Sequence, residues 1–158
     1  MIFEDVTDFA AALPKLAPLA GLDLGTKTIG VAVSDAMLTI ASPLETIKRT
    51  KFKADATRLF EITAHRRIAG IVLGLPRNMD GTEGPRAQST RAFARNLSNL
   101  TELPITYWDE RLSTVAAERA LLEADASRKH RAEVIDNVAA SIILQGLLDR
   151  LSHLRSAS

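Results

Sequence analysis

The chain has 158 residues, 46% of them hydrophobic and 25% charged, a composition typical of one folded globular domain and not of a disordered chain. It contains no cysteine, which excludes disulfides, thiolate metal sites and a thiol nucleophile. No apolar run approaches the ~20 residues needed to cross a bilayer, and the net charge of +1 points to no partner by itself. We therefore expect a soluble, cytoplasmic protein with a mainly aliphatic core.

The first 18 residues are predicted to form an accessory segment. Asp5 can cap a short helix, and Pro14 and Pro18 would stop that helix before the first main strand. We assign this segment no chemistry and expect the main domain to cover residues 19–158.

The next stretch, GLDLGTKTIGVAVSD at residues 21–35, predicts two antiparallel strands joined by a tight turn. Side chains alternate along a strand, so Asp23 shares one face with Gly21 and Gly25. An unpaired carboxylate is costly to bury, which favours a place where a cation approaches the backbone. The alternative is that Asp23 ends the strand and accepts hydrogen bonds from the turn.

The remaining elements alternate between helix and strand. Pro43 interrupts the third strand and favours an edge position or a bulge. In chain order, the patterns predict strands at 19–25, 28–34 and 38–47, a helix at 52–66, a central strand at 68–75, a helix at 85–97, a strand at 104–108, and helices at 113–122 and 132–151. This order predicts a mixed α/β sheet, whose sites usually lie at the carboxyl ends of the strands.

Three acidic residues are predicted to converge at that edge. Asp23 lies in the first strand, Glu110 follows a later strand, and Asp136 lies in the first turns of the last helix, on its apolar face. Carboxylates in such a set suit Mg²⁺ or Mn²⁺, and two such ions can drive phosphodiester hydrolysis by water. The residues alone thus suggest a nuclease. Weaker candidates for the same cluster are Asp35, Asp109 and Glu133.

Simpler roles for two of these acids remain open. Glu110 could form a salt bridge with Arg111 or another surface base, and Asp136 could be a charge at the start of the helix that the helix dipole favours. Two basic clusters, at residues 48–53 and 128–131, could bind phosphates or merely face water. Phosphate-binding loops of the P-loop and dinucleotide-binding types are absent, and the three histidines lie far apart in the sequence.

Four segments together resemble the signature blocks of the YqgF/RuvX family of Holliday-junction-resolvase-like, pre-16S rRNA-associated nucleases. They are GLDLGTKTIGVAVSD (21–35), VLGLPRNMDGTEG (72–84), DERLSTVAAE (109–118) and IDNVAASIILQGLL (135–148). The resemblance implies an RNase H-like fold, with a five-stranded mixed sheet, helices on both faces and an acidic metal centre.

The resemblance also implies roles for individual residues. Asp23, Glu110 and Asp136 would be catalytic and would hold Mg²⁺ or Mn²⁺. Arg77 stands where the family usually has an apolar residue, which leaves a phosphate contact as one role for it. The residues expected to bind substrate are Thr26, Lys27, Thr28, Arg77, Asn78, Arg128, Lys129 and Arg131.

The implied function is a metal-dependent endonuclease acting on structured nucleic acid, in processing of the pre-16S rRNA ends. One alternative is a Holliday junction resolvase, and another is a non-catalytic nucleic-acid-binding module. The first segment also resembles the phosphate-binding segment of actin-like ATPases and sugar kinases, but 158 residues are too few for their second domain. The sequence leaves open whether the protein is a monomer or a homodimer.

Overall fold

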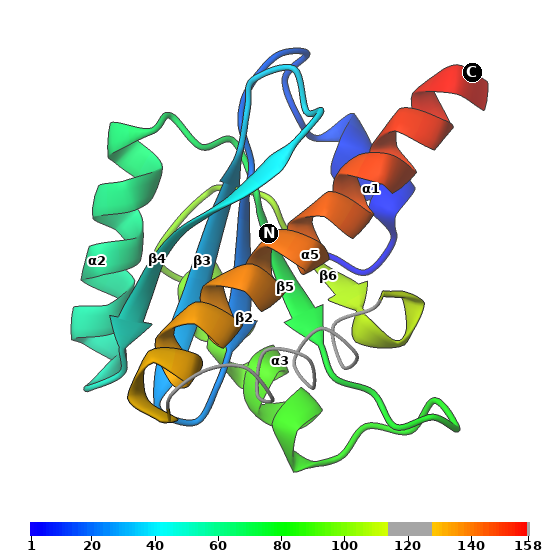
Figure 1. The fold of residues 1–158 in the computed structure, drawn as a ribbon. Helices are drawn as coiled ribbons and strands as arrows, with labels where there is room; N and C mark the ends of the chain where they lie inside the picture. Colours follow the sequence, from blue (N-terminus) through cyan, green and yellow to red (C-terminus); the bar gives the residue numbers. More distant parts are fainter. Residues whose placement is uncertain (114–127, 158) are drawn as a thin grey trace.

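The computed structural model describes residues 1–113 and 128–157, in which helices cover both faces of a mixed sheet (Figure 1). The strands follow the order β1-β6-β5-β2-β3-β4 across the sheet. In chain order the elements are β1 (Ile2–Phe3), α1 (Val6–Ala11), β2 (Ala20–Leu24), β3 (Thr28–Ser34), β4 (Ala41–Lys48), α2 (Phe52–His65), β5 (Ile71–Leu75), α3 (Pro85–Ser98), β6 (Ile105–Asp109), the 3-10 helix η1 (Glu110–Leu112) and α5 (Arg128–Ala157).

Strand β2 is the point where the sheet changes direction. It pairs with β3 in antiparallel fashion and with β5 in parallel, and β5 in turn pairs with β6 in parallel. The carboxyl ends of β2, β5 and β6 therefore meet at one edge, the lower edge in Figure 1. Strand β4 lies at the border of the sheet and its register shifts at Pro43, as the sequence predicts.

Two differences from the sequence prediction stand out. The sheet has six strands and not five, because β1 pairs with β6 through Ile2 and Ile105. Helix α5 begins at Arg128, so the basic run 128–131 belongs to the helix and is not a loop before it. Arginine and lysine are good helix formers, which explains the longer helix. The predicted helix at 113–122 lies outside the described residues from residue 114 on.

Each face of the sheet has its own hydrophobic core. Helices α2 and α3 pack on one face with Leu59 and Phe93, and α1 and α5 pack on the other with Phe9 and Leu144. The N-terminal helix is capped by Asp5, which accepts a hydrogen bond from the Thr7 amide. None of the described helices is long and apolar enough to cross a membrane.

Candidate functional site

Asp23 lies on β2, on the face of the sheet that α5 covers, and is only 2% exposed. It is paired across the sheet with Gly30 of β3. On the other side, the parallel register with β5 ends at Leu22 and Leu73, which makes Gly74 the β5 residue next to Asp23. Because glycine has no side chain, the surface on both sides of this carboxylate is open to groups from other elements.

Asp136 enters the space on one side. Helix α5 passes so close to β3 that a Cβ atom on Gly30 would overlap the main-chain carbonyl of Asp136. The hydroxyl of Thr28, at the start of β3, donates a hydrogen bond to Asp136 Oδ2. Asp136 is 9% exposed and lies on the packing face of α5, as the sequence predicts. Because α5 begins at Arg128, Asp136 lies beyond its first turn, and the helix dipole does not explain this acid.

Glu110 enters the space on the other side. It follows β6 directly in η1, and its Oε1 lies 2.8 Å from where a Cβ atom on Gly74 would be. Arg111, one of the bases that could pair with Glu110, forms an ion pair with Asp109 at 2.7 Å. The fold therefore places Glu110 and Asp136 over the two glycines that flank Asp23.

The chemistry of this patch is that of a hard divalent cation, because every donor is an oxygen. The described residues contain no ready-made group of three His, Cys, Asp or Glu ligands for a metal ion. Mg²⁺ does not require such a cage, since it keeps several waters and commonly takes one or two carboxylates together with substrate phosphates. The carboxylates of Asp23 and Asp136 and the hydroxyl of Thr28 fit that requirement.

The weaker candidates for the acidic cluster either bind other groups or have side chains outside the described residues. Arg111 and Arg77 bind Asp109, and the hydrogen bonds from Arg111 hold the pKa of this carboxyl below its ordinary value. Asp35 follows the far end of β3 and accepts hydrogen bonds from the Ile40 amide and from Thr39, which lower its pKa to about 2. The side chain of Glu133 lies outside the described residues.

The predicted substrate-binding residues fall into several groups. Thr26 and Lys27 are exposed on the β2–β3 turn beside the acids. Asn78 closes the loop after β5 through a hydrogen bond to Thr82. Arg77 faces Glu83 at 3.4 Å and Asp109 at 3.7 Å, so it holds this loop against the end of β6. Arg128, Lys129 and Arg131 start α5, and their side chains lie outside the described residues.

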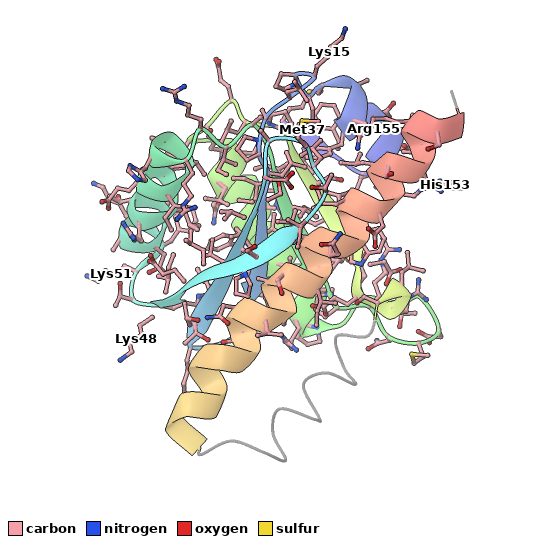
Figure 2. All side chains as sticks on the ribbon, turned by 45° about the horizontal axis from the view of Figure 1, so that its top comes forward. Lys15, Met37, Lys48, Lys51, His153 and Arg155 are labelled. Atoms are coloured by element: carbon pink, nitrogen blue, oxygen red, sulfur yellow. The ribbon has the colours of Figure 1, made fainter. Side chains whose placement is uncertain are left out.

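Two arginines near the site were not predicted. Arg49 Nη1 donates to the carbonyl of Gly25 at 2.6 Å, and Arg86 Nη2 donates to the carbonyl of Leu24 at 3.2 Å. The basic cluster at 48–53 was the available signal for Arg49, and Figure 2 shows its neighbours Lys48 and Lys51 pointing away from the body of the protein. Nothing local in the sequence distinguishes Arg86.

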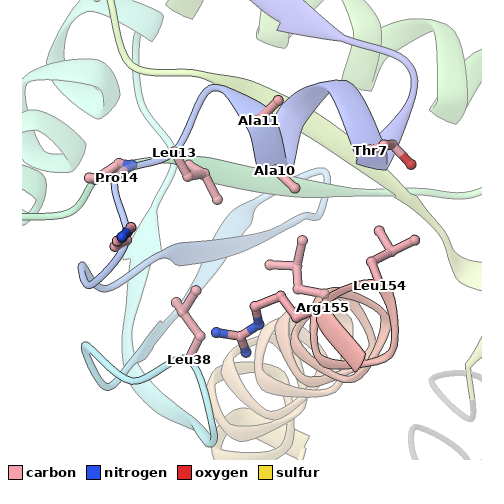
Figure 3. Close-up of a pocket in the computed structure, with 10 residues that line it drawn as sticks. Thr7, Ala10, Ala11, Leu13, Pro14, Leu38, Leu154 and Arg155 are labelled. Atoms are coloured by element: carbon pink, nitrogen blue, oxygen red, sulfur yellow. The ribbon is translucent and has the colours of Figure 1, made fainter. Parts of the chain in front are cut away.

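A separate cavity of about 370 Å³ lies between α1 and the carboxyl-terminal part of α5 (Figure 3). Leu13, Leu38 and Leu154 are among the residues that line it, together with Lys15 and Arg155, and none of the described lining residues is acidic. Leu38 belongs to the β3–β4 connection, which lies at the opposite edge of the sheet from Asp23. This cavity is therefore distinct from the acidic patch.

Comparison with protein families supplies independent information. The family model described as RuvX, Holliday junction resolvase, matches residues 17–150. This range includes all three acids and leaves out most of the N-terminal segment.

Two relatives with the name "Putative pre-16S rRNA nuclease" match nearly the whole chain. One, from Ruegeria sp. (strain TM1040), is 71% identical over 99% of this chain and 100% of its own length. The other, from Ruegeria pomeroyi, is 72% identical over 98% of this chain and 100% of its own length. Among solved structures, Thermus thermophilus RuvC in complex with a Holliday junction substrate matches with a TM-score of 0.53 and 13% identity, covering 86% of this chain and 96% of that one. The last match confirms the predicted RNase H-like fold.

Proposed function

Since this chain belongs to the RuvX family of Holliday junction resolvases, we propose that it is a metal-dependent endonuclease that hydrolyses phosphodiester bonds in structured nucleic acid. The full-length match to proteins named as pre-16S rRNA nucleases favours the ends of the 16S rRNA precursor as its substrate. We expect this hydrolysis to take place in the cytoplasm.

The observation that carries the proposal is the arrangement around Asp23. Neighbouring strands present glycines on both sides of this buried carboxylate. The main chain of Asp136 fills the space beside Gly30, and Ile143 and Glu110 Oε1 fill the space beside Gly74. The glycines therefore let α5 and η1 bring two further acids up to Asp23, and a set of acidic oxygens from three elements suits hard divalent cations.

We assign Asp23, Glu110 and Asp136 as the catalytic carboxylates. Bound Mg²⁺ or Mn²⁺ would supply an activated water and neutralise charge on the leaving oxygen. Asp23 would hold the cation from the rigid centre of the sheet, while Thr28 orients Asp136 through its hydrogen bond. Glu110 would complete the set from the end of β6.

Phosphates on either side of the reacting one would be bound by basic residues around this edge. Lys27 is exposed on the turn next to the acids. We also assign this role to Arg128, Lys129 and Arg131 at the start of α5. Contacts of this kind position a nucleic acid but do not read its sequence.

The decisive experiment compares the wild-type protein with Asp23→Asn. We expect the variant to keep its fold and its affinity for nucleic acid but to lose cleavage by at least about 100-fold, because the metal's contribution to the transition state is worth several kcal/mol. Cleavage is measured with Mg²⁺, with Mn²⁺ and with a chelator present. Full activity in Asp23→Asn would remove this residue from the mechanism. Absence of cleavage by the wild-type protein would favour the alternative that the protein is a non-catalytic nucleic-acid-binding module.

A second candidate function, resolution of four-way DNA junctions, is favoured by the description of the matching family. A precursor rRNA and a four-way junction are therefore tested in parallel. A resolvase must place two active sites on one junction, so the mass of the protein in solution bears on this choice. Cleavage of the junction by a dimer would favour the resolvase, and cleavage of the rRNA precursor alone would favour rRNA processing.

A further inference from the structure

A cavity of about 240 Å³ lies beside the acidic patch, on the face of the sheet that α2 and α3 cover. Its walls come from the end of β2, the β4–α2 connection and the first turns of α3. The residues with polar side chains in these walls are Thr26, Arg49, Arg86, Ser89 and Thr90. None of the described residues that line the cavity is acidic, so these walls carry a positive charge from the two arginines.

The two arginines of this cavity are not neutralised by a described carboxylate, whereas four other arginines are. Arg58, Arg77, Arg91 and Arg111 each pair with at least one carboxylate. Within residues 1–113 and 128–157, Arg49 and Arg86 have no carboxylate within ion-pairing distance, and each uses one nitrogen to bind a main-chain carbonyl of β2 or its turn. A guanidinium offers five N–H donors, so both keep donors for another group.

Arg49 is also held in place. Its guanidinium carbon lies 5.7 Å from the ring centre of Phe93, and its amide donates to the carbonyl of Lys27 at 2.8 Å. These contacts fix a charged fork at the cavity and reduce the entropy lost when the fork binds an anion. The first turn of α3, which starts at Pro85 in the wall, adds the positive end of a helix dipole.

Gly25 connects the cavity to the acids. It lines the cavity on one side, while on the other side a Cβ atom on Gly25 would lie 3.5 Å from Asp136 Oδ2. Only the main chain of the β2–β3 turn therefore separates the two sites. A nucleic-acid strand that has one phosphate at the acids can pass over this turn and place a neighbouring phosphate in the cavity.

We propose that Arg49 and Arg86, with the hydroxyl of Ser89, form a subsite that binds a backbone phosphate next to the one that is hydrolysed. This inference rests on the proposed nuclease function for the position of the strand. Binding at the cavity itself does not depend on metal or on Asp23. The subsite reads no base, because the planar guanidinium groups bind oxygens of a tetrahedral phosphate, and contacts to the backbone carry no sequence information.

The test is the salt dependence of binding. A labelled single-stranded RNA of about 20 nucleotides is titrated with the protein, in the presence of chelator, at several KCl concentrations. Each phosphate contact to a single strand contributes about 0.7 to the slope of log K against log [salt]. We expect Arg86→Gln to make this negative slope shallower by roughly that amount. We expect the double variant, Arg49→Gln with Arg86→Gln, to bind the RNA about tenfold more weakly at low salt.

Two controls separate a local contact from a general charge effect or a loss of folding. Arg95→Gln removes the same charge from the other end of α3, where the side chain is exposed, and should leave the slope unchanged. Arg86→Lys keeps the charge and should keep the slope. Thermal unfolding shows whether each variant is folded, and Arg86→Gln removes only one hydrogen bond.

The outcomes distinguish this inference from the nuclease proposal. A slope that is the same in wild type, Arg86→Gln and the double variant overturns the subsite, whatever the cleavage assay shows. A lower slope in these two variants but not in Arg95→Gln supports it, even if Asp23→Asn still cleaves.

Discussion

At the scale of single residues, the acidic patch depends on a hydroxyl as well as on carboxylates. Thr28 stands at the start of β3, where its hydroxyl can reach Asp136 on a helix more than 100 residues later in the chain. Asp136 is largely buried, and a buried carboxylate requires donors to offset its lost hydration. Thr28 is therefore part of what allows α5 to bring an acid to the sheet.

We expect Thr28→Val to destabilise the protein by about 1–2 kcal/mol, because it removes a hydrogen bond to a charged group while keeping the shape of the side chain. Urea unfolding measures this loss. Thr28→Ser retains the hydroxyl and should retain most of the stability. Equal stability of the valine variant and the wild type would show that Asp136 does not need this donor.

At the scale of elements, the glycines of β2, β3 and β5 set how closely α5 packs on the sheet. A Cβ atom on Gly21 would lie 2.7 Å from Leu144 Cβ, and one on Gly30 would overlap the backbone of Asp136. Leu144 and Asp136 both belong to α5, eight residues apart. The helix thus approaches the sheet along its length, and its position determines where Asp136 lies.

We expect Gly30→Ala to cost about 1–3 kcal/mol, because the added methyl group must push the helix backbone away. It should also lower cleavage activity by displacing Asp136. Gly84→Ala is the control: its Cβ would meet no atom closer than 3.8 Å, and we expect a cost below about 1 kcal/mol. Differential scanning calorimetry and the cleavage assay measure the two effects, and similar costs at both positions would contradict the close-packing argument.

Elements could be predicted from the sequence where a local pattern of residues determines them. The strand at 28–34 and the helix at 52–65 have clear periodic patterns, and their predicted bounds agree with the structure to within one residue. Strand β1 has only two residues and exists because Ile105 and Thr106 of β6 offer it a partner. No local pattern reports such a pairing.

The site divides in the same way. The three acids could be predicted because each stands within a recognisable segment of sequence. The glycine spaces at Gly30 and Gly74, and the cavity with Arg49 and Arg86, depend on contacts between elements far apart in the chain. Such contacts follow from the topology, which the order of elements gives only in outline.

At the scale of the whole molecule, one ion-pair network around Arg91 joins segments that lie far apart in the sequence. Arg91 of α3 binds Glu83 at 2.6 Å and also contacts Glu4, and its guanidinium carbon lies 4.8 Å from the ring centre of Tyr107. Glu83 in turn faces Arg77 at 3.4 Å. The network therefore links the N-terminal segment, the loop after β5, α3 and β6.

This network predicts a dependence of stability on pH. Hydrogen bonds from Arg91 hold the pKa of Glu83 below its ordinary value of 4.5. A carboxyl with a lowered pKa in the folded state stabilises the protein at pH values above its unfolded pKa, and that contribution is lost as the pH falls through the folded pKa. We therefore expect Glu83→Gln to have a lower Tm than the wild type at pH 7, and the two Tm values to converge as the pH falls through and below 4. Glu102→Gln removes an exposed carboxylate that forms no ion pair in the described part of the chain, and should follow the wild type throughout. A gap between Glu83→Gln and the wild type that persists unchanged in acid would mean that the side chain acts through its shape and not through its charge.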